Sequence, residues 1–142
     1  MWRFLLIPLF VVVAGCVQIP PSPQETQAKQ FESVPGKAVI YIVRAYPGGY
    51  YGHGSLWLGE SIMITTMAGN FFRWEVAPGP HRIVGMGPDL SRMTINAEGG
   101  RIYFVQHHVL AGARSSTSGG YLQMLPEREG RALVQRATLI GG

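Results

Sequence analysis

Residues 38–45, Ala-Val-Ile-Tyr-Ile-Val-Arg-Ala, decide the fold of this chain. They are rich in β-branched and aromatic side chains, and they are apolar at odd and even positions alike. A strand with one face in water alternates between polar and apolar residues, whereas a strand that is covered on both faces does not. We therefore predict that residues 38–45 form a central strand with a packed layer on each side.

Further strand segments follow at short, regular intervals, with turn residues between them. Residues 71–76 alternate, which places Phe72, Trp74 and Val76 on one face of a half-buried strand. The other predicted strands are residues 55–58, 61–66, 81–86, 92–96, 101–110 and 121–125. This series predicts an all-β fold, an antiparallel β-sandwich.

Two turns in the second half of the chain have a distinct composition. Pro78-Gly79 is typical of a type II turn, in which proline fixes φ at the first corner and glycine takes a positive φ at the second. Glu98-Gly99-Gly100 predicts a hairpin turn.

A short helix is predicted near the C-terminus, over residues 126–136. Pro126 and the acidic residues after it suit a first helical turn. Leu133 and Ala137 are expected to face the domain, whereas Gly130 weakens the helix.

The N-terminal residues have the pattern of an export signal. Val13-Ala14-Gly15-Cys16 has the form of a bacterial lipobox, after an apolar run at residues 4–13 and a positive charge at Arg3. The run is too short to span a bilayer, which takes about 20 apolar residues. We predict that residues 1–15 are a lipoprotein signal peptide and that Cys16 is the lipidation site.

The region after Cys16 is rich in proline and glutamine. Such composition predicts an extended, flexible tether over residues 16–35, with a helical turn at residues 28–32 as the alternative. The β-sandwich domain is then residues 36–142. Because Val17 rather than aspartate follows the cysteine, we expect a lipid-anchored, periplasm-facing protein of the outer membrane in a Gram-negative cell.

Composition excludes several classes of partner and chemistry. Cys16 is the only cysteine, so the domain has neither a disulfide nor a cysteine-based metal site. The formal net charge of +4 comes from scattered Lys and Arg rather than from a basic cluster. We therefore expect no nucleic-acid partner, and no cofactor.

Three stretches carry a resemblance to a known family. They are Gly36-Lys37-Ala38 with Tyr41 and Arg44, Val76-Ala77-Pro78-Gly79-Pro80-His81, and Glu98-Gly99-Gly100-Arg101-Ile102-Tyr103-Phe104-Val105. Together they resemble a family of small bacterial lipoproteins with a domain of unknown function, and the middle stretch is similar to a hairpin of PEGA-type modules. The resemblance implies a transthyretin-like (prealbumin-like) sandwich and supplies no catalytic residues.

Catalysis and metal binding find little support in the residue pattern. His107 and His108 are adjacent in a strand and so point to opposite faces. A metal site would require His53 or His81 to converge with them and with Asp89 or Glu98, which no spacing demands. His81 is expected to hydrogen-bond its own turn. No serine stands in a nucleophile elbow, so we predict that the protein is not an enzyme and has neither catalytic nor metal-binding residues.

The best candidate for a recognition site is the glycine- and tyrosine-rich loop at residues 46–54. Exposed tyrosines among glycines are a frequent composition of binding loops. The candidate residues are Tyr46, Tyr50, Tyr51, His53 and Trp57.

The predicted function is that of a membrane-anchored envelope lipoprotein with a non-catalytic binding or structural module. Its partners would be the membrane, through the lipid, and an envelope protein or the cell wall. The first alternative is an accessory subunit of an envelope or secretion complex; a hydrolase or metal-binding enzyme ranks below it.

The lipidation prediction is tested by the intact mass of the native protein beside Cys16→Ser. We expect a mass equal to residues 16–142 plus acyl chains in the membrane fraction, because two or more buried chains hold a protein firmly. Cys16→Ser should remain unprocessed and lose the acyl mass. A native protein of unmodified mass in the soluble fraction would contradict the prediction.

Overall fold

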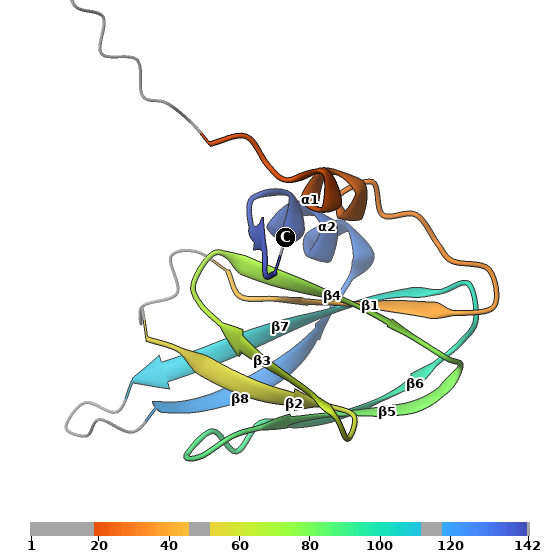
Figure 1. The fold of residues 1–142 in the computed structure, drawn as a ribbon. Helices are drawn as coiled ribbons and strands as arrows, with labels where there is room; N and C mark the ends of the chain where they lie inside the picture. The colour runs from red at the N-terminus through yellow and green to blue at the C-terminus, as the bar shows by residue number, and fades with distance from the viewer. Residues whose placement is uncertain (1–18, 46–51, 112–117, 142) are drawn as a thin grey trace, which may run out of the picture.

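The fold is a two-sheet β-sandwich with two short helices on one of its outer faces (Figure 1). The computed structural model describes residues 19–45, 52–111 and 118–141. The first sheet has the order β8 (Ser118–Leu125), β7 (Ile102–Ala111), β1 (Ala38–Val43), β4 (Asn70–Val76) and β9 (Thr138–Leu139). The second has the order β3 (Ile62–Thr66), β2 (Gly54–Leu58), β5 (Gly79–Gly85) and β6 (Arg92–Ala97).

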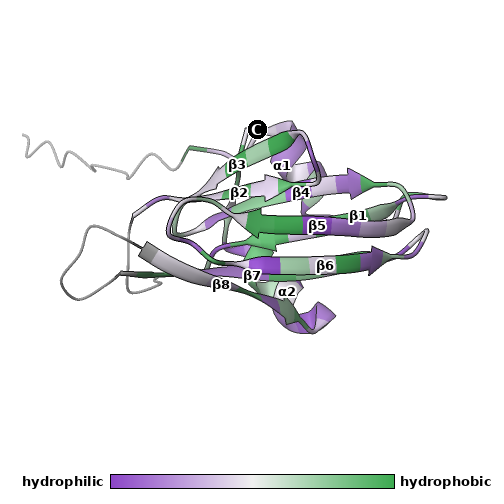
Figure 2. Ribbon diagram, turned by 90° about the horizontal axis from the view of Figure 1, so that it is seen from below, coloured by the Kyte–Doolittle hydropathy of each residue, from purple (hydrophilic) through white to green (hydrophobic). Residues whose placement is uncertain are grey.

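The helices distinguish the two sheets. The helices α1 (Pro23–Ala28) and α2 (Glu127–Gln135) lie on the first sheet, which we call the helix-covered sheet. The second, which we call the open sheet, has no helix of the described residues over its outer face (Figure 2). Among the described residues, no helix has the length and apolar character needed to cross a bilayer.

β1 lies in the middle of the helix-covered sheet, and all six of its residues are buried. Ala38, Ile40 and Ile42 face the open sheet, whereas the alternate residues face the helices. The predicted central strand with a layer on each side is therefore confirmed.

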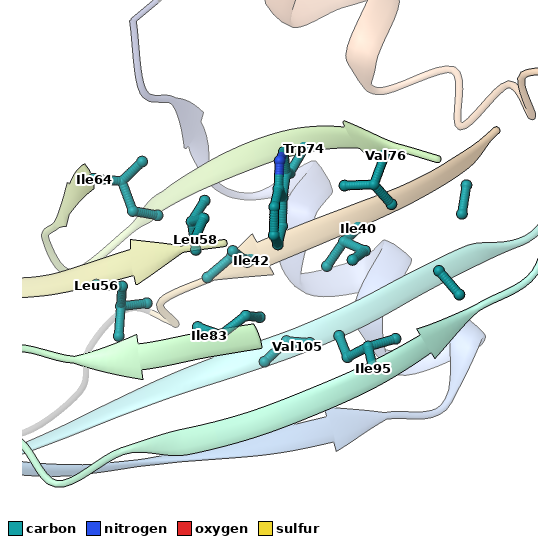
Figure 3. Close-up of a cluster of buried hydrophobic side chains, with 12 residues drawn as sticks. Ile40, Ile42, Leu56, Leu58, Ile64, Trp74, Val76, Ile83, Ile95 and Val105 are labelled. Atoms are coloured by element: carbon teal, nitrogen blue, oxygen red, sulfur yellow. The ribbon is translucent and has the colours of Figure 1, made fainter. Parts of the chain in front are cut away.

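The core between the sheets is aliphatic and contains one tryptophan (Figure 3). Ile40 and Ile42 meet Leu56, Leu58 and other side chains of the open sheet there. Trp74 and Val76 enter this core from β4, as their alternation predicted. Further members are Ile64, Ile83, Ile95 and Val105.

The core beneath the helices is aromatic. The rings of Tyr41 and Phe104 stack with centroids 5.2 Å apart, and Phe31 packs against both. The Tyr41 hydroxyl donates a hydrogen bond of 2.7 Å to the carbonyl of Ala28, so α1 is tied directly to β1. Aromatic pairs of this kind are worth about 0.5–1.5 kcal/mol beyond the area that they bury.

The sheets are not wholly antiparallel. β1 runs parallel to β7, and β9 runs parallel to β4. The prediction of an antiparallel sandwich is wrong at these two pairs, although the two-sheet, all-β architecture is confirmed. Parallel neighbours need a long crossover, and between β1 and β7 the chain makes the whole open sheet.

Two predicted hairpin turns are corners between the sheets. The turn at residues 98–100 joins β6 of the open sheet to β7 of the helix-covered sheet, and Pro78 lies where β4 gives way to β5 in the same manner. The hairpin prediction for residues 98–100 is therefore wrong. Gly79 has a φ of 125°, so its predicted positive φ is confirmed.

The N-terminal segment differs from the predicted tether. Ser22 caps α1 by accepting a hydrogen bond of 3.1 Å from the backbone N–H of Glu25. Ala28 and Phe31 are buried in the aromatic core. The described part of the expected flexible tether therefore contains a docked helix, which lies earlier in the chain than the alternative at residues 28–32.

Glu25 fixes this helix to the C-terminal end of the chain. Its carboxylate accepts a hydrogen bond of 3.1 Å from the backbone N–H of Leu139 and forms an ion pair of 2.6 Å with Lys29. Burial raises the pKa of Glu25, but these hydrogen bonds and the charge of Lys29 outweigh it, so the pKa lies below its usual value. The two ends of the domain thus close over the same sheet.

The predicted C-terminal helix is confirmed as α2. Ala137 is buried and Leu133 packs on the aromatic core. Gly130 is buried against Phe104, and a Cβ atom at residue 130 would overlap the Phe104 ring. The glycine that weakens the helix is therefore required for its close approach to β7.

Gly130→Ala is expected to destabilise the protein, although alanine normally favours a helix by about 1 kcal/mol over glycine. The overlap with Phe104 should cost about 1–3 kcal/mol or more, because overpacking shifts side chains and backbone. Urea denaturation measures the change. Gly119→Ala is the control, since a Cβ there meets nothing within 4 Å. Equal stability of the two variants would contradict this packing account.

Candidate functional site

A buried polar cluster lies between the sheets, at the end where β1 and β3 finish and β2 begins. His107 enters it from β7, because odd-numbered residues of this strand, such as Val105, face the open sheet. Thr66 ends β3, and Asp89 belongs to the loop between β5 and β6. The exposed fractions of these residues are 0% for the His107 side chain and 1% and 5% for Thr66 and Asp89.

His107 is the centre of the cluster. Its Nε2 lies 2.7 Å from Oδ2 of Asp89, and its Nδ1 lies 2.9 Å from Oγ1 of Thr66. The other carboxylate oxygen of Asp89 accepts hydrogen bonds from the backbone N–H of Ser91, at 2.9 Å, and from the Ser91 hydroxyl. The Asp89 carboxylate thus connects the β5–β6 loop to a strand of the opposite sheet.

Arg44 brings a positive charge to the same end of the sandwich. It follows β1 directly and is 3% exposed. Its Nη1 donates to the carbonyls of Gly52, at 2.6 Å, and of Thr66, at 3.1 Å. These two hydrogen bonds satisfy part of the guanidinium, which lowers the cost of burying its charge.

Three glycines make room for these side chains. A Cβ atom on Gly54 would lie 2.8 Å from Cε1 of His107. A Cβ on Gly85 would lie 2.6 Å, and one on Gly120 2.7 Å, from atoms of Asp89. Real Cβ atoms do not approach other atoms so closely, so the cluster depends on glycine at all three positions.

Burial favours the neutral form of His107. Loss of water contact lowers its pKa below the ordinary value of 6.5, with smaller contributions from Arg44 and His108. The hydrogen bond and the charge of Asp89 act in the opposite direction without reversing the shift. In the neutral ring, Nε2–H donates to the Asp89 carboxylate, and the single hydroxyl proton of Thr66 is shared between Nδ1 and the carbonyl of Gly54.

The cluster contains the residue types of a hydrolytic triad but not its accessibility. A nucleophilic hydroxyl must reach a substrate carbonyl, and Thr66 is 1% exposed with its Oγ1 also 3.1 Å from the carbonyl of Gly54. The arrangement suits a structural role instead, since it ties together β3, β7 and the β5–β6 loop.

Of the five residues that the sequence singled out for recognition, the structure describes His53 and Trp57. Tyr46, Tyr50 and Tyr51 lie outside the described residues. His53 is exposed, and Trp57 projects outward from β2 on the open sheet.

The predictions for the other histidines are confirmed. His107 points into the sandwich, whereas His108 points outward and stacks on Tyr121 with ring centroids 4.2 Å apart. Nε2 of His81 lies 2.6 Å from the carbonyl of Ala77, in the turn that precedes β5. No group of three His, Cys, Asp or Glu residues could hold a metal ion within the described part of the chain.

Sequence reasoning named Asp89 and His107 separately and missed their pairing. The signal that could have found it is the apolar parity of residues 103–109, in which His107 shares a face with Val105 and Val109. A histidine on an apolar face needs a buried partner. Only the folded loop identifies Asp89 as that partner.

A second feature is a shallow pocket on the outer face of the open sheet. Its volume is about 730 Å³. Trp57, 38% exposed, lies beside Val84 of β5 in the sheet register. The remaining lining residues are Gly59, Glu60, Pro80, His81, Arg82 and Thr94. Among the described residues, the lining comes from β2, β5, β6 and the turn between β2 and β3, and Trp57 is its member from β2.

Comparisons with known proteins identify no relative: no family model, no curated protein and no solved structure matches this chain.

The buried His107 predicts a pH dependence of stability. Because its folded-state pKa lies below 6.5, the unfolded chain binds more protons just below that pH. The free energy of unfolding should therefore fall as the pH is lowered from 7 towards 5. Glu25 and Glu75 also have lowered pKa values. Because the ordinary pKa of a glutamate is 4.5, these two groups change the stability at lower pH than His107 does.

The measurement is urea denaturation at pH 7 and pH 5 on the wild type, His107→Asn and His108→Asn. His107→Asn should lose about 1.5–3 kcal/mol at pH 7, the value of a hydrogen bond to a charged group, and should flatten the pH dependence. His108→Asn alters the adjacent but outward-facing histidine and should keep the wild-type slope. An unchanged slope in His107→Asn would show that the pH dependence has another source.

Proposed function

We propose that this protein is a membrane-anchored envelope lipoprotein with a non-catalytic β-sandwich that binds its partner through the outer face of the open sheet. The anchor follows from the lipobox that ends at Cys16. The observation that carries the proposal is the asymmetry of the sandwich: helices cover one sheet, and the other exposes Trp57 beside a pocket. An exposed tryptophan in a polar setting is characteristic of binding surfaces.

We also propose that the sandwich is of the transthyretin type that the sequence resemblance implies. What supports this assignment is the strand order, with β8-β7-β1-β4 facing β3-β2-β5-β6 and with β1 and β7 parallel. Fold type alone says nothing of the ligand.

The absence of catalysis is part of the proposal. It is supported by the state of the cluster that most resembles a catalytic triad: His107, Asp89 and Thr66 are buried, and hydrogen bonds join His107 to the other two. A reactive group needs access to substrate, and this cluster instead joins strands and a loop.

The test is site-specific photocrosslinking in intact cells. A photoreactive residue at Thr94, exposed on the open sheet, should form adducts with envelope material, whereas one at Tyr121, exposed on β8 of the other sheet, should not. Cys16→Ser should abolish the adducts, because the unprocessed protein lacks the lipid that places the domain at the outer membrane. Adducts at Tyr121 with none at Thr94 would contradict the proposed face. A stoichiometric multi-protein complex at Thr94 would identify the accessory-subunit form of the proposal.

A further inference from the structure

We propose that the outer face of the open sheet binds an acidic glycan, with a sugar ring on Trp57 and carboxylates on Arg82 and Arg92. The inference rests on the proposed function and names the ligand class of the same face. Three observations carry it: the side chains that the sheet register brings together, the charge of the two arginines, and the exposure of Trp57, Arg82 and Arg92 to solvent.

The register assembles a platform of outward-facing side chains from four strands. Trp57 lies opposite Val84, and Arg82 lies opposite Thr94. Alternation along each strand turns these residues to the same outer face. The other residues of this face are Ser55, Met63, Thr65, Pro80, Arg92 and Asn96.

The side chains of the platform suit a sugar. The apolar face of a sugar ring packs on an indole, and Trp57 presents one that is 38% exposed. Hydroxyl and amide groups on the neighbouring strands, such as Thr94 and Asn96, supply hydrogen bonds for the sugar hydroxyls. Glu60, in the pocket beside Trp57, adds an acceptor for a hydroxyl or an amide N–H.

The charge of the platform points to an anion. Arg82 and Arg92 are both exposed, and they are diagonal neighbours in the β5–β6 register. The four strands of the open sheet contain no aspartate or glutamate. A guanidinium binds a carboxylate through two parallel hydrogen bonds, which a lysine cannot do. A glycan that carries several carboxylates along its length would therefore match both arginines.

The source that the proposed location supplies is the cell-wall polymer, whose amino sugars bear carboxylate-containing substituents. An anionic lipid surface would also attract the two arginines, but it gives no role to the hydroxyl and amide groups around Trp57. The experiment below separates the two sources.

The experiment is co-sedimentation of the full-length lipoprotein, in mild detergent, with purified peptidoglycan sacculi. Wild-type protein should sediment with untreated sacculi and should lose binding when the sacculus carboxylates have been amidated. Polygalacturonate should compete, whereas neutral dextran and phosphatidylglycerol mixed micelles should not. Competition by the micelles but not by polygalacturonate would overturn the proposal in favour of a lipid surface.

Matched variants locate the site. Trp57→Ala, Arg82→Gln and Arg92→Gln should each weaken sacculus binding by about tenfold or more, the value of a charged hydrogen bond or a buried aromatic contact. Tyr121→Ala and Arg101→Gln remove an exposed aromatic ring and an exposed charge elsewhere and should bind like the wild type. Circular dichroism confirms that each variant is folded.

Equal binding by all five variants, or no binding by the wild type, would overturn the glycan assignment. Either result would leave the proposed function standing if Thr94 still forms anchor-dependent adducts in cells, because a protein partner would then occupy the same face. Loss of those adducts as well would overturn both.

Discussion

The whole architecture follows from the need to bury β1 on both faces. Six consecutive apolar residues, Ala38–Val43, leave no side of this strand for water. Full burial of a large apolar side chain is worth about 1.5–3 kcal/mol, so exposing either face would forfeit much of the net stability of a small domain. The open sheet covers one face and the two helices cover the other.

The buried polar cluster adds specificity where the hydrophobic core ends. Apolar packing alone does not determine how the β5–β6 loop meets the opposite sheet. The pair between Asp89 and His107 does so, because a buried charge must find its partner. Gly54, Gly85 and Gly120 belong to the same arrangement, because a side chain at any of them would overlap His107 or Asp89.

The two outer faces of the sandwich differ. One is covered by helices and contributes to stability, and the other is the face that we propose for binding. The N-terminal segment and α2 both contribute to the aromatic core over the helix-covered sheet, and Glu25 connects α1 to β9. The open sheet keeps its tryptophan, arginines and hydroxyl groups in solvent. With α1 docked close after the lipid anchor proposed at Cys16, the chain would hold the helix-covered side near its tether and leave the other side for a partner.

The sequence by itself determined the class of the fold and most of its strands, because hydrophobic alternation is a local property of the chain. It identified the double burial of residues 38–43 within the predicted strand 38–45, the inward face of Trp74 and Val76, the helix after Pro126 and the opposite directions of His107 and His108. Tertiary structure decided what depends on distant contacts. Residues 98–100 have hairpin composition but join two sheets, and proline-rich residues 19–35 fold onto aromatic side chains supplied by β1 and β7. The same holds for the meeting of Asp89 with His107, which depends on how the β5–β6 loop folds, and for the platform around Trp57, which strand register assembles from separate segments.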